Sequence, residues 1–294
     1  MLARLTAYPP EQAAIVRSLR GTVVLRIGRA EDSDLALGHA SVSRNHAVLQ
    51  GHDASWILRD LGSKNGTFVG GAQVGEATLE GGCWLRFGEV YCEFAPVTAE
   101  EDALAESRMH ARRATAIAQT ARIDAMQQLD DVLDGSLRGV LELAQCDRGF
   151  VLLDEGDGLA VRASLALDPA RLATRAFSGS VGAVRRVLAG NRSLVANDIG
   201  AEPWLASRAS VIAGGLQALV CLPLLDDGRA IGAIYADRTR PGAPVTTLDL
   251  ELLEAFAEHA ALWVAARRAS AVFARAAGAV SWDGILAAHA GAPA

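Results

Sequence analysis

The sequence predicts a multidomain protein in which an all-β sandwich is joined by a helical linker to an α+β domain. The chain has 294 residues, about twice the length of a typical single domain. Short β-branched runs between glycine-rich turns fill its first part, and alanine and charged residues replace glycine from Thr98 onward. The predicted divisions are 1–97 for the sandwich, 98–122 for the linker, 123–270 for the second domain and 271–294 for a weakly structured tail.

The sandwich is predicted from short strands with frequent turns. A β-branched run covers residues 23–27, and residues 46–50 and 55–58 form two more strands around a turn. Residues 83–87 and 90–94 flank Gly88-Glu89 as a hairpin.

The second domain is predicted from alternating helix and strand patterns. Apolar residues recur every three or four positions over 126–145, which indicates an amphipathic helix, and residues 100–121 form a weaker, alanine-faced linker helix. The remaining predicted elements are strands at 149–154, 159–164, 218–225 and 230–237, a helix at 181–189, and a long helix from 248 towards 275.

Composition excludes several classes of protein. Hydrophobic residues make up 51% and charged residues 21%, so the chain is not disordered, and the net charge of −6 argues against direct nucleic-acid binding. The longest uncharged stretch, 209–225, is broken by glycine and proline and predicts no membrane span, and the N-terminus does not look like a signal peptide. The four cysteines lie far apart, so we expect a cytoplasmic protein with no disulfide framework, no metal and no cofactor.

Three loop clusters of the sandwich carry candidate chemistry. They are Gly28-Arg29, residues 41–46 and residues 60–67, and the loops of a sandwich gather at its ends. An arginine fork, a serine hydroxyl and a lysine ammonium together suit a phosphate monoester. A metal site at His39, His46 and His52 is the weaker alternative, because their spacing is not that of metal ligands.

The order Gly-Arg, Ser-x-x-His, Gly-Ser-x-Asn-Gly-Thr resembles a forkhead-associated (FHA) domain, a reader of phosphothreonine peptides. The resemblance covers about residues 23–94. It implies that Arg29 and Ser43 hold the phosphate, that Arg44 and Lys64 flank the phosphopeptide, and that Asn65 holds the peptide main chain.

The same resemblance gives the remaining residues supporting roles. Ser41 lies where the family tunes its selectivity, and His46 braces the loops. Gly28 and Gly66 permit tight turns. Gly70-Gly71 replaces the asparagine-glycine that the family often has in the next hairpin, which questions the rigidity of that hairpin. An FHA fold that no longer binds phosphate is the alternative.

The second domain resembles a GAF domain, a family of small-molecule sensors and dimerisation modules. The matching stretches lie at 178–181, 194–198, 219–224, 230–237 and 249–257. These residues serve mainly the fold, so they do not identify the small-molecule ligand. One enzymatic alternative is a GAF-type reductase of free methionine sulfoxide using Cys146 and Cys221, although Cys221 sits in an apolar strand where thiols are usually inert. We assign no catalytic residue.

FHA followed by GAF resembles the sensory half of bacterial sigma-54-dependent regulators. We therefore expect a bacterial signalling adaptor, linked to transcription regulation, whose partner is a phosphothreonine-bearing substrate of a serine/threonine kinase. We also expect a homodimer, with Leu253, Phe256, Ala260 and Trp263 packing against a second copy. The alternative is that these apolar faces only cover the sheet of their own domain. An inert scaffold with a ligand-free GAF domain is the alternative within binding modules.

Overall fold

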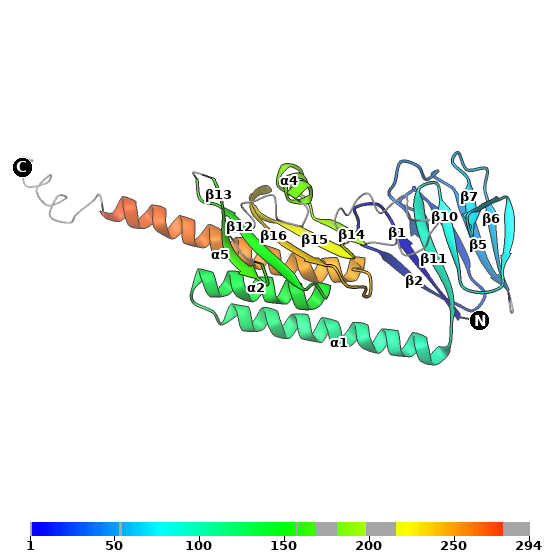
Figure 1. Ribbon diagram of the computed structural model, residues 1–294, viewed down its shortest axis with the longest axis horizontal. Coiled ribbons are helices and arrows are strands. Elements are labelled where there is room, and N and C mark those ends of the chain that lie inside the picture. Colours follow the sequence, from blue (N-terminus) through cyan, green and yellow to red (C-terminus); the bar gives the residue numbers. More distant parts are fainter. Residues whose placement is uncertain (1, 53–54, 157, 168–180, 198–215, 279–294) are drawn as a thin grey trace, which may run out of the picture.

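The computed structural model describes residues 2–52, 55–156, 158–167, 181–197 and 216–278 (Figure 1). A β-sandwich at one end is followed by a long helix that leads to an α+β domain. No described helix is long and apolar enough to cross a membrane.

The sandwich consists of a six-stranded and a five-stranded sheet, as predicted. The strand order is β2-β1-β11-β10-β7-β8 in one sheet and β4-β3-β5-β6-β9 in the other, and all pairs are antiparallel except β3 with β4. The strands are β1 (Leu2–Tyr8), β2 (Ile15–Arg20), β3 (Val24–Gly28), β4 (Leu35–Ala36), β5 (Ala47–His52), β6 (Ser55–Asp60), β7 (Thr67–Val69), β8 (Ala72–Val74), β9 (Glu76–Leu79), β10 (Cys83–Phe87) and β11 (Val90–Val97).

Alternating side chains of the two sheets form the sandwich core. Trp56 and Phe94 are fully buried and meet edge-on, with ring centroids 5.8 Å apart. In β1, alternate residues Ala3, Leu5 and Ala7 point into this core. The outer face of β1 is therefore left for contacts with the rest of the chain.

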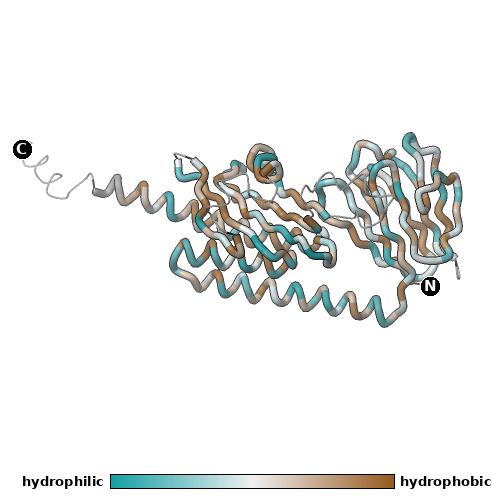
Figure 2. The backbone as a smooth tube through the Cα atoms, viewed as in Figure 1, coloured by the Kyte–Doolittle hydropathy of each residue, from teal (hydrophilic) through white to brown (hydrophobic). Residues whose placement is uncertain are grey.

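The second domain is built on a five-stranded antiparallel sheet of order β13-β12-β16-β15-β14. Helices α2 and α5 cover one face, α4 covers the other, and α1 lies outside α2 (Figure 1). Figure 2 shows hydrophobic stretches along the central strands, as expected for strands buried on both faces. The elements are α1 (Ala99–Asp124), α2 (Leu129–Ala144), β12 (Arg148–Asp154), β13 (Leu159–Leu165), α4 (Val181–Gly190), β14 (Leu194–Asn197), β15 (Ala218–Asp226), β16 (Arg229–Arg238) and α5 (Thr247–Gly278).

Helix α1 begins at a capping box. The Thr98 side chain accepts from the Glu101 backbone N–H, and the Glu101 carboxylate accepts from the Thr98 backbone N–H. Further along the helix, Ala116 and Ile123 are buried in a core to which α2 and α5 also contribute. The second half of the linker helix is thus packed on the second domain.

Helix α5 corrects two predictions. It continues without a break through Gly278, so residues 271–278 are helical and do not belong to a weakly structured tail; alanine in this stretch favours helix. Leu253, Phe256 and Ala260 are fully buried in the domain's own core, so they are not available to a second copy. Residues 279–294 lie outside the described residues.

Candidate functional site

The three predicted loops lie together at one end of the sandwich. Arg29 follows the end of β3, Ser43 precedes β5, and Lys64 and Asn65 connect β6 to β7. Strands β3 and β6 each pair antiparallel with β5, so both end where β5 begins. The fold therefore brings the three loops to one edge.

Hydrogen bonds join these loops directly. The Arg29 backbone N–H donates to the Ser43 carbonyl (2.9 Å), and Arg29 Nε donates to the Val42 carbonyl (3.2 Å). The Lys64 backbone N–H donates to Ser43 Oγ (3.0 Å). Asn65 Nδ2 donates to the Ser41 carbonyl (2.7 Å), which leaves its Oδ1 as an acceptor for another chain.

The cations at this edge have no acidic partner among the described residues. Arg29, Arg44 and Lys64 are exposed, and none of them enters an ion pair within the described part of the chain. Because Arg29 uses only Nε internally, both terminal nitrogens of its fork remain available. The hydroxyl of Ser43 accepts from Lys64 and keeps its own proton to donate.

His46 braces the loops, in the role that the resemblance implies. It is fully buried; its Nδ1 accepts from the Ser43 backbone N–H (3.0 Å), so its Nε2 carries the proton and donates to the Gly66 carbonyl (3.2 Å). Burial lowers the pKa of His46 and outweighs the opposing effects of the Gly66 carbonyl and Asp60. The neutral imidazole therefore links two loops by a hydrogen bond to each.

Asp60 organises the third loop, a role that the sequence analysis missed. Its carboxylate accepts from the hydroxyls of Ser63 and Thr67 (both 2.6 Å) and from the backbone N–H groups of Gly62 and Ser63 (both 2.9 Å). Burial raises the pKa of Asp60, but these four hydrogen bonds prevail and hold the pKa below its ordinary value. An aspartate two residues before a glycine in a loop is a signal for such a turn.

Glycines allow the loops to approach one another. A Cβ on Gly28 would stand 2.0 Å from the Arg44 carbonyl oxygen, which no side chain can tolerate. Gly66 has a φ of +78°, which side chains rarely adopt. Gly70 and Gly71 also have positive φ and form the two-residue turn between β7 and β8, so the hairpin forms without the family's asparagine.

Ser41 has an internal role in addition to its predicted one. Its Oγ accepts from the Glu89 backbone N–H and contacts His39 Nδ1, both at 2.8 Å. A Cβ on Gly88 would stand 2.4 Å from the Ser41 carbonyl oxygen. The β10–β11 turn is thereby fixed against the loop that carries Ser43, a contact that the sequence analysis did not predict.

The second domain contacts the sandwich through the loop between β1 and β2. The Ala14 backbone N–H donates to the Val245 carbonyl (2.8 Å), and the Ala14 carbonyl accepts from the Thr247 N–H (2.9 Å). Glu11 of the same loop forms an ion pair with Arg186 of α4. The two domains are therefore joined by more than the helical linker.

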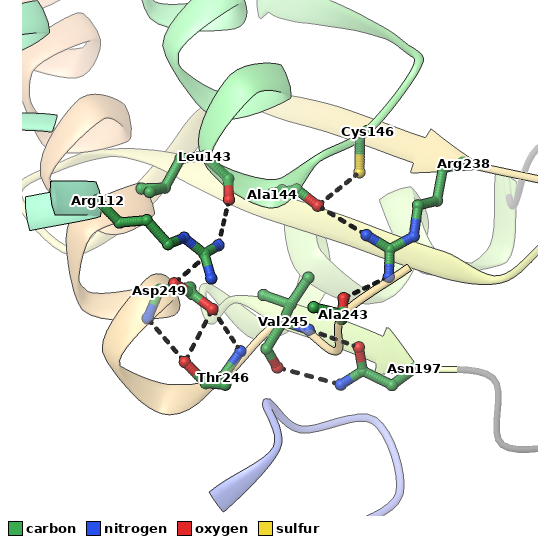
Figure 3. A network of polar contacts seen from close by, with 10 residues as sticks. All are labelled: Arg112, Leu143, Ala144, Cys146, Asn197, Arg238, Ala243, Val245, Thr246 and Asp249. Atoms are coloured by element: carbon green, nitrogen blue, oxygen red, sulfur yellow. Dashed lines mark hydrogen bonds and ion pairs between the residues drawn. The ribbon is translucent and has the colours of Figure 1, made fainter. Parts of the chain in front are cut away.

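Figure 3 shows the network behind this contact. Arg112 of α1 pairs with the buried carboxylate of Asp249 (3.0 Å) and donates to the Leu143 carbonyl at the end of α2 (2.6 Å). Asn197 bonds both the N–H and the carbonyl of Val245, at 2.8 and 3.1 Å. The segment that receives the sandwich loop is thus fixed by the linker helix and by the edge strand of the sheet.

The described thiols are poorly suited to redox catalysis. Cys146 and Cys221 are buried, and burial raises the pKa of each thiol to about 12. Little thiolate is present near neutral pH, and the thiolate is the reactive form. This removes support for the reductase alternative, and no group of three or more described histidine, cysteine or acidic residues could hold a metal.

On the α4 face of the sheet, where the second domain could hold a ligand, the described residues pack together. Phe150 stacks on Tyr235 with ring centroids 4.9 Å apart, beneath Val184 and Val187 of α4. A Cβ on Gly232 would stand 2.2 Å from the Leu152 carbonyl oxygen, so the two strands approach closely there. Pro223 lies within β15. Pro223 stands beyond the end of β14, where β15 is the sheet edge and a missing N–H is tolerated.

Comparison with known families decides the assignment of the two domains. A family model of the FHA domain matches residues 25–88, and a family model of the GAF domain matches residues 128–263. The chain carries an FHA domain followed by a GAF domain. These matches confirm the resemblance of the first domain to FHA domains and of the second to GAF domains, in that order.

Curated relatives match in the FHA domain. FhaB of Mycolicibacterium smegmatis, described as an FHA domain-containing protein, is 38% identical over 77 residues, which are 26% of this chain and 50% of FhaB. The transcriptional regulatory protein EmbR of Mycobacterium tuberculosis is 40% identical over 62 residues, which are 21% of this chain and 16% of EmbR. The chain spans half the length or less of these relatives.

Solved structures of FHA domains also align with this region. A structure of Mycobacterium tuberculosis EmbR in complex with a low affinity phosphopeptide aligns with a TM-score of 0.28 and 30% identity, covering 32% of this chain and 25% of that one. The FHA domain of the CT664 protein from Chlamydia trachomatis aligns with a TM-score of 0.32 and 25% identity, covering 33% of this chain and all of that one.

Proposed function

We propose that the FHA domain binds phosphothreonine in a partner protein, with Arg29 and Ser43 on the phosphate and Lys64 and Arg44 beside it. The observation that carries this proposal is the convergence of three loops on Ser43, whose backbone and hydroxyl receive hydrogen bonds from Arg29 and Lys64. The cations there remain unneutralised by described acids, so a doubly charged anion supplies the missing counter-charge.

Sequence similarity supports the same chemistry. EmbR, which is 40% identical over the matching region, has been solved with a phosphopeptide. Asn65 presents a free Oδ1 towards solvent, where it accepts from the main chain of a bound peptide. We propose that Ser41 and Asn65 read the residues around the phosphothreonine, and that a serine/threonine kinase produces the partner.

The experiment is a titration of the full chain with a fluorescent phosphothreonine peptide and with its unphosphorylated counterpart. A peptide library or a pull-down from host lysate supplies the sequence. Replacing Arg29 by Ala should weaken phosphopeptide binding by about tenfold or more. Arg229→Ala, on the exposed hairpin between β15 and β16, is the charge-matched control. Equal affinity for the two peptides contradicts the proposal.

We propose that the GAF domain adds a sensing or dimerising function, which makes the chain a cytoplasmic signalling adaptor with no enzymatic step of its own. A role in transcription regulation, as in sigma-54-dependent regulators, is the corresponding expectation for its output. A small molecule that raises the unfolding temperature of the GAF domain distinguishes a sensor from an inert scaffold.

The face proposed for a homodimer must differ from the one predicted by sequence. Leu262, Val272 and Phe273 of α5 are 70%, 62% and 73% exposed, and α5 extends beyond the edge of the sheet in Figure 1. A second α5 packed there would cover these side chains. Light scattering of the native chain should give a dimer, and Phe273→Ser should shift it towards monomer, whereas a monomer at all concentrations rejects this face.

A further inference from the structure

A cleft of about 590 Å³ lies between the outer face of the FHA sheet and the GAF domain. Strands β1 and β2 form one wall, the first half of α1 forms another, and the start of α5 closes one side. This cleft is separate from the loops around Ser43, none of which lines it. Its volume falls within the range of small-molecule sites, which often lie between domains.

The face of α1 that lines the cleft is charged where an ordinary packing face would be apolar. From this helix the cleft is lined by Asp102, Glu106, Arg108, Arg112 and Arg113, together with Ala105 and Met109. Further along the same helix, Ala116 is buried in the GAF core. The first half of α1 therefore borders a space between the domains that the GAF core does not fill.

Five arginines line the cleft, and four of them, Arg4, Arg17, Arg108 and Arg113, enter no ion pair among the described residues. Arg113 is exposed and enters no ion pair there, whereas Arg112 is already neutralised by Asp249. Arg4, from β1, is half-buried, and its Nη2 is shielded from solvent with no hydrogen-bond partner. That nitrogen has no acceptor among the described residues, so Arg4 is not committed to a partner within the chain.

Three of the acids that line the cleft are paired with arginines: Asp102 and Glu106 with Arg20, and Asp249 with Arg112. Glu93 keeps its charge and accepts from the Tyr8 hydroxyl, which also lines the cleft. Glu101 lies close enough to Arg4 for the arginine to affect its pKa, but its carboxylate is committed to the α1 capping box. A positive excess thus remains in the cleft of a chain whose net charge is −6.

The cleft also offers a strip of apolar surface and several hydroxyls. Val16, Met109 and Leu252 contribute side-chain carbon, and Thr6 and Thr247 contribute hydroxyl groups. A purely inorganic anion would leave the apolar strip uncovered. A ligand with an anionic group and a compact apolar body satisfies both parts of the surface.

We propose that this cleft binds a small organic phosphate, with Arg4 and Arg113 holding its phosphate and the strip formed by Val16, Met109 and Leu252 covering its organic part. Because the FHA sheet, the linker helix and the GAF domain all contribute walls, the ligand contacts both domains at once. Occupancy would stabilise one relative arrangement of the two domains.

The test uses the full chain carrying Arg29→Ala, so that the loops around Ser43 do not bind phosphate. Adenosine 5′-monophosphate, adenosine and inorganic phosphate are titrated by calorimetry, with citrate as a carboxylate anion of comparable charge. Adenosine 5′-monophosphate should bind most tightly, with a dissociation constant below about 1 mM. Tighter binding of citrate, or no saturable binding of the monophosphate, overturns the assignment.

Variants and hydrogen exchange locate the site. Arg4→Gln and Arg113→Gln should each weaken binding by about tenfold. Arg122→Gln, on the same helix but outside the cleft, should leave the affinity unchanged. Bound ligand should slow exchange in β1 and in residues 99–113. Protection confined to the α4 face of the GAF sheet, or affinity that survives both arginine substitutions, contradicts the proposal.

Discussion

The side-chain oxygen of Ser43 accepts a hydrogen bond from the backbone N–H of Lys64 across 3.0 Å, and this contact ties two loops that are 21 residues apart in the sequence. The same hydroxyl retains its proton for an incoming phosphate. Ser43 therefore builds the edge of the sandwich at which we propose that phosphate binds.

Replacing Ser43 by Ala should weaken phosphopeptide binding by about tenfold, because one charge-assisted hydrogen bond is lost and the Lys64 loop is released. Fluorescence anisotropy with a phosphothreonine peptide measures the change. Ser107→Ala, on the exposed side of α1, is the matched control and should bind as the native chain does. Unchanged affinity of Ser43→Ala would remove Ser43 from the phosphate site.

Gly28→Ala should destabilise the FHA domain by about 1–3 kcal/mol, because the new methyl group would collide with the Arg44 carbonyl oxygen. Gly38→Ala is a close control, since a Cβ there meets nothing within 4 Å. Urea unfolding of the two variants measures the difference. Equal stability of the two would show that the loop relaxes freely, which the close approach of Gly28 and Arg44 does not allow.

The stability of the native chain should fall as the pH drops below about 6.5, the ordinary pKa of histidine, and His46 should account for part of this fall. Burial lowers the pKa of His46 in the folded state, so below that pH the unfolded chain binds the additional proton. Unfolding free energies at pH 7.5 and 5.5 measure the effect. His46→Asn should show a smaller difference between the two pH values; an identical difference would mean that His46 contributes nothing to it.

Asp60 should act in the same direction as His46 but at lower pH. Hydrogen bonds hold its pKa below the ordinary value, so its contribution to stability is complete above pH of about 4 and is lost as the pH falls further. Asp60→Asn should destabilise the domain by about 1–3 kcal/mol at neutral pH, because an amide nitrogen would face hydroxyl and N–H donors. Asp226→Asn, which is exposed, is the control in thermal unfolding and should be nearly neutral.

Thiol labelling at pH 8 should leave Cys146 and Cys221 unmodified in the folded chain, because burial raises the pKa of both thiols to about 12. All four cysteines should react after unfolding in guanidinium. Mass spectrometry identifies the labelled residues. Rapid modification of Cys221 in the native chain would revive the reductase alternative.

The sequence allowed the sandwich, the linker helix and most strands of the GAF domain to be predicted, because each follows from local periodicity. Strands β1 and β2 were missed, since the alanines of β1 have low strand propensity and take their place through pairing with β11. Helix α5 was predicted to end near residue 275 but continues through Gly278. No glycine or proline marks an earlier end in the sequence.

For the candidate site, the sequence order indicated which loops to examine but not how they are held together. Spacing alone cannot show that Ser41 anchors the Glu89 turn, because that contact joins loops 48 residues apart. The hydrogen bonds of Asp60 are local, so the Asp60-x-Gly62 pattern could have indicated that turn. The dimer face predicted from the sequence was wrong, because apolar spacing along a helix does not show which surface covers it. Phe256 belongs to an apolar face of α5 that packs in the core of its own domain.

The loop that contains Ala14 leaves the sandwich at the end where Tyr8 pairs with Tyr91, just past the Gly88-Glu89 turn. The GAF domain therefore contacts the FHA domain at the end that carries the loops around Ser43. An FHA fragment cut at residue 97 would lose this contact, so the loops around Ser43 would be tested there without the neighbouring domain that the intact chain places beside them.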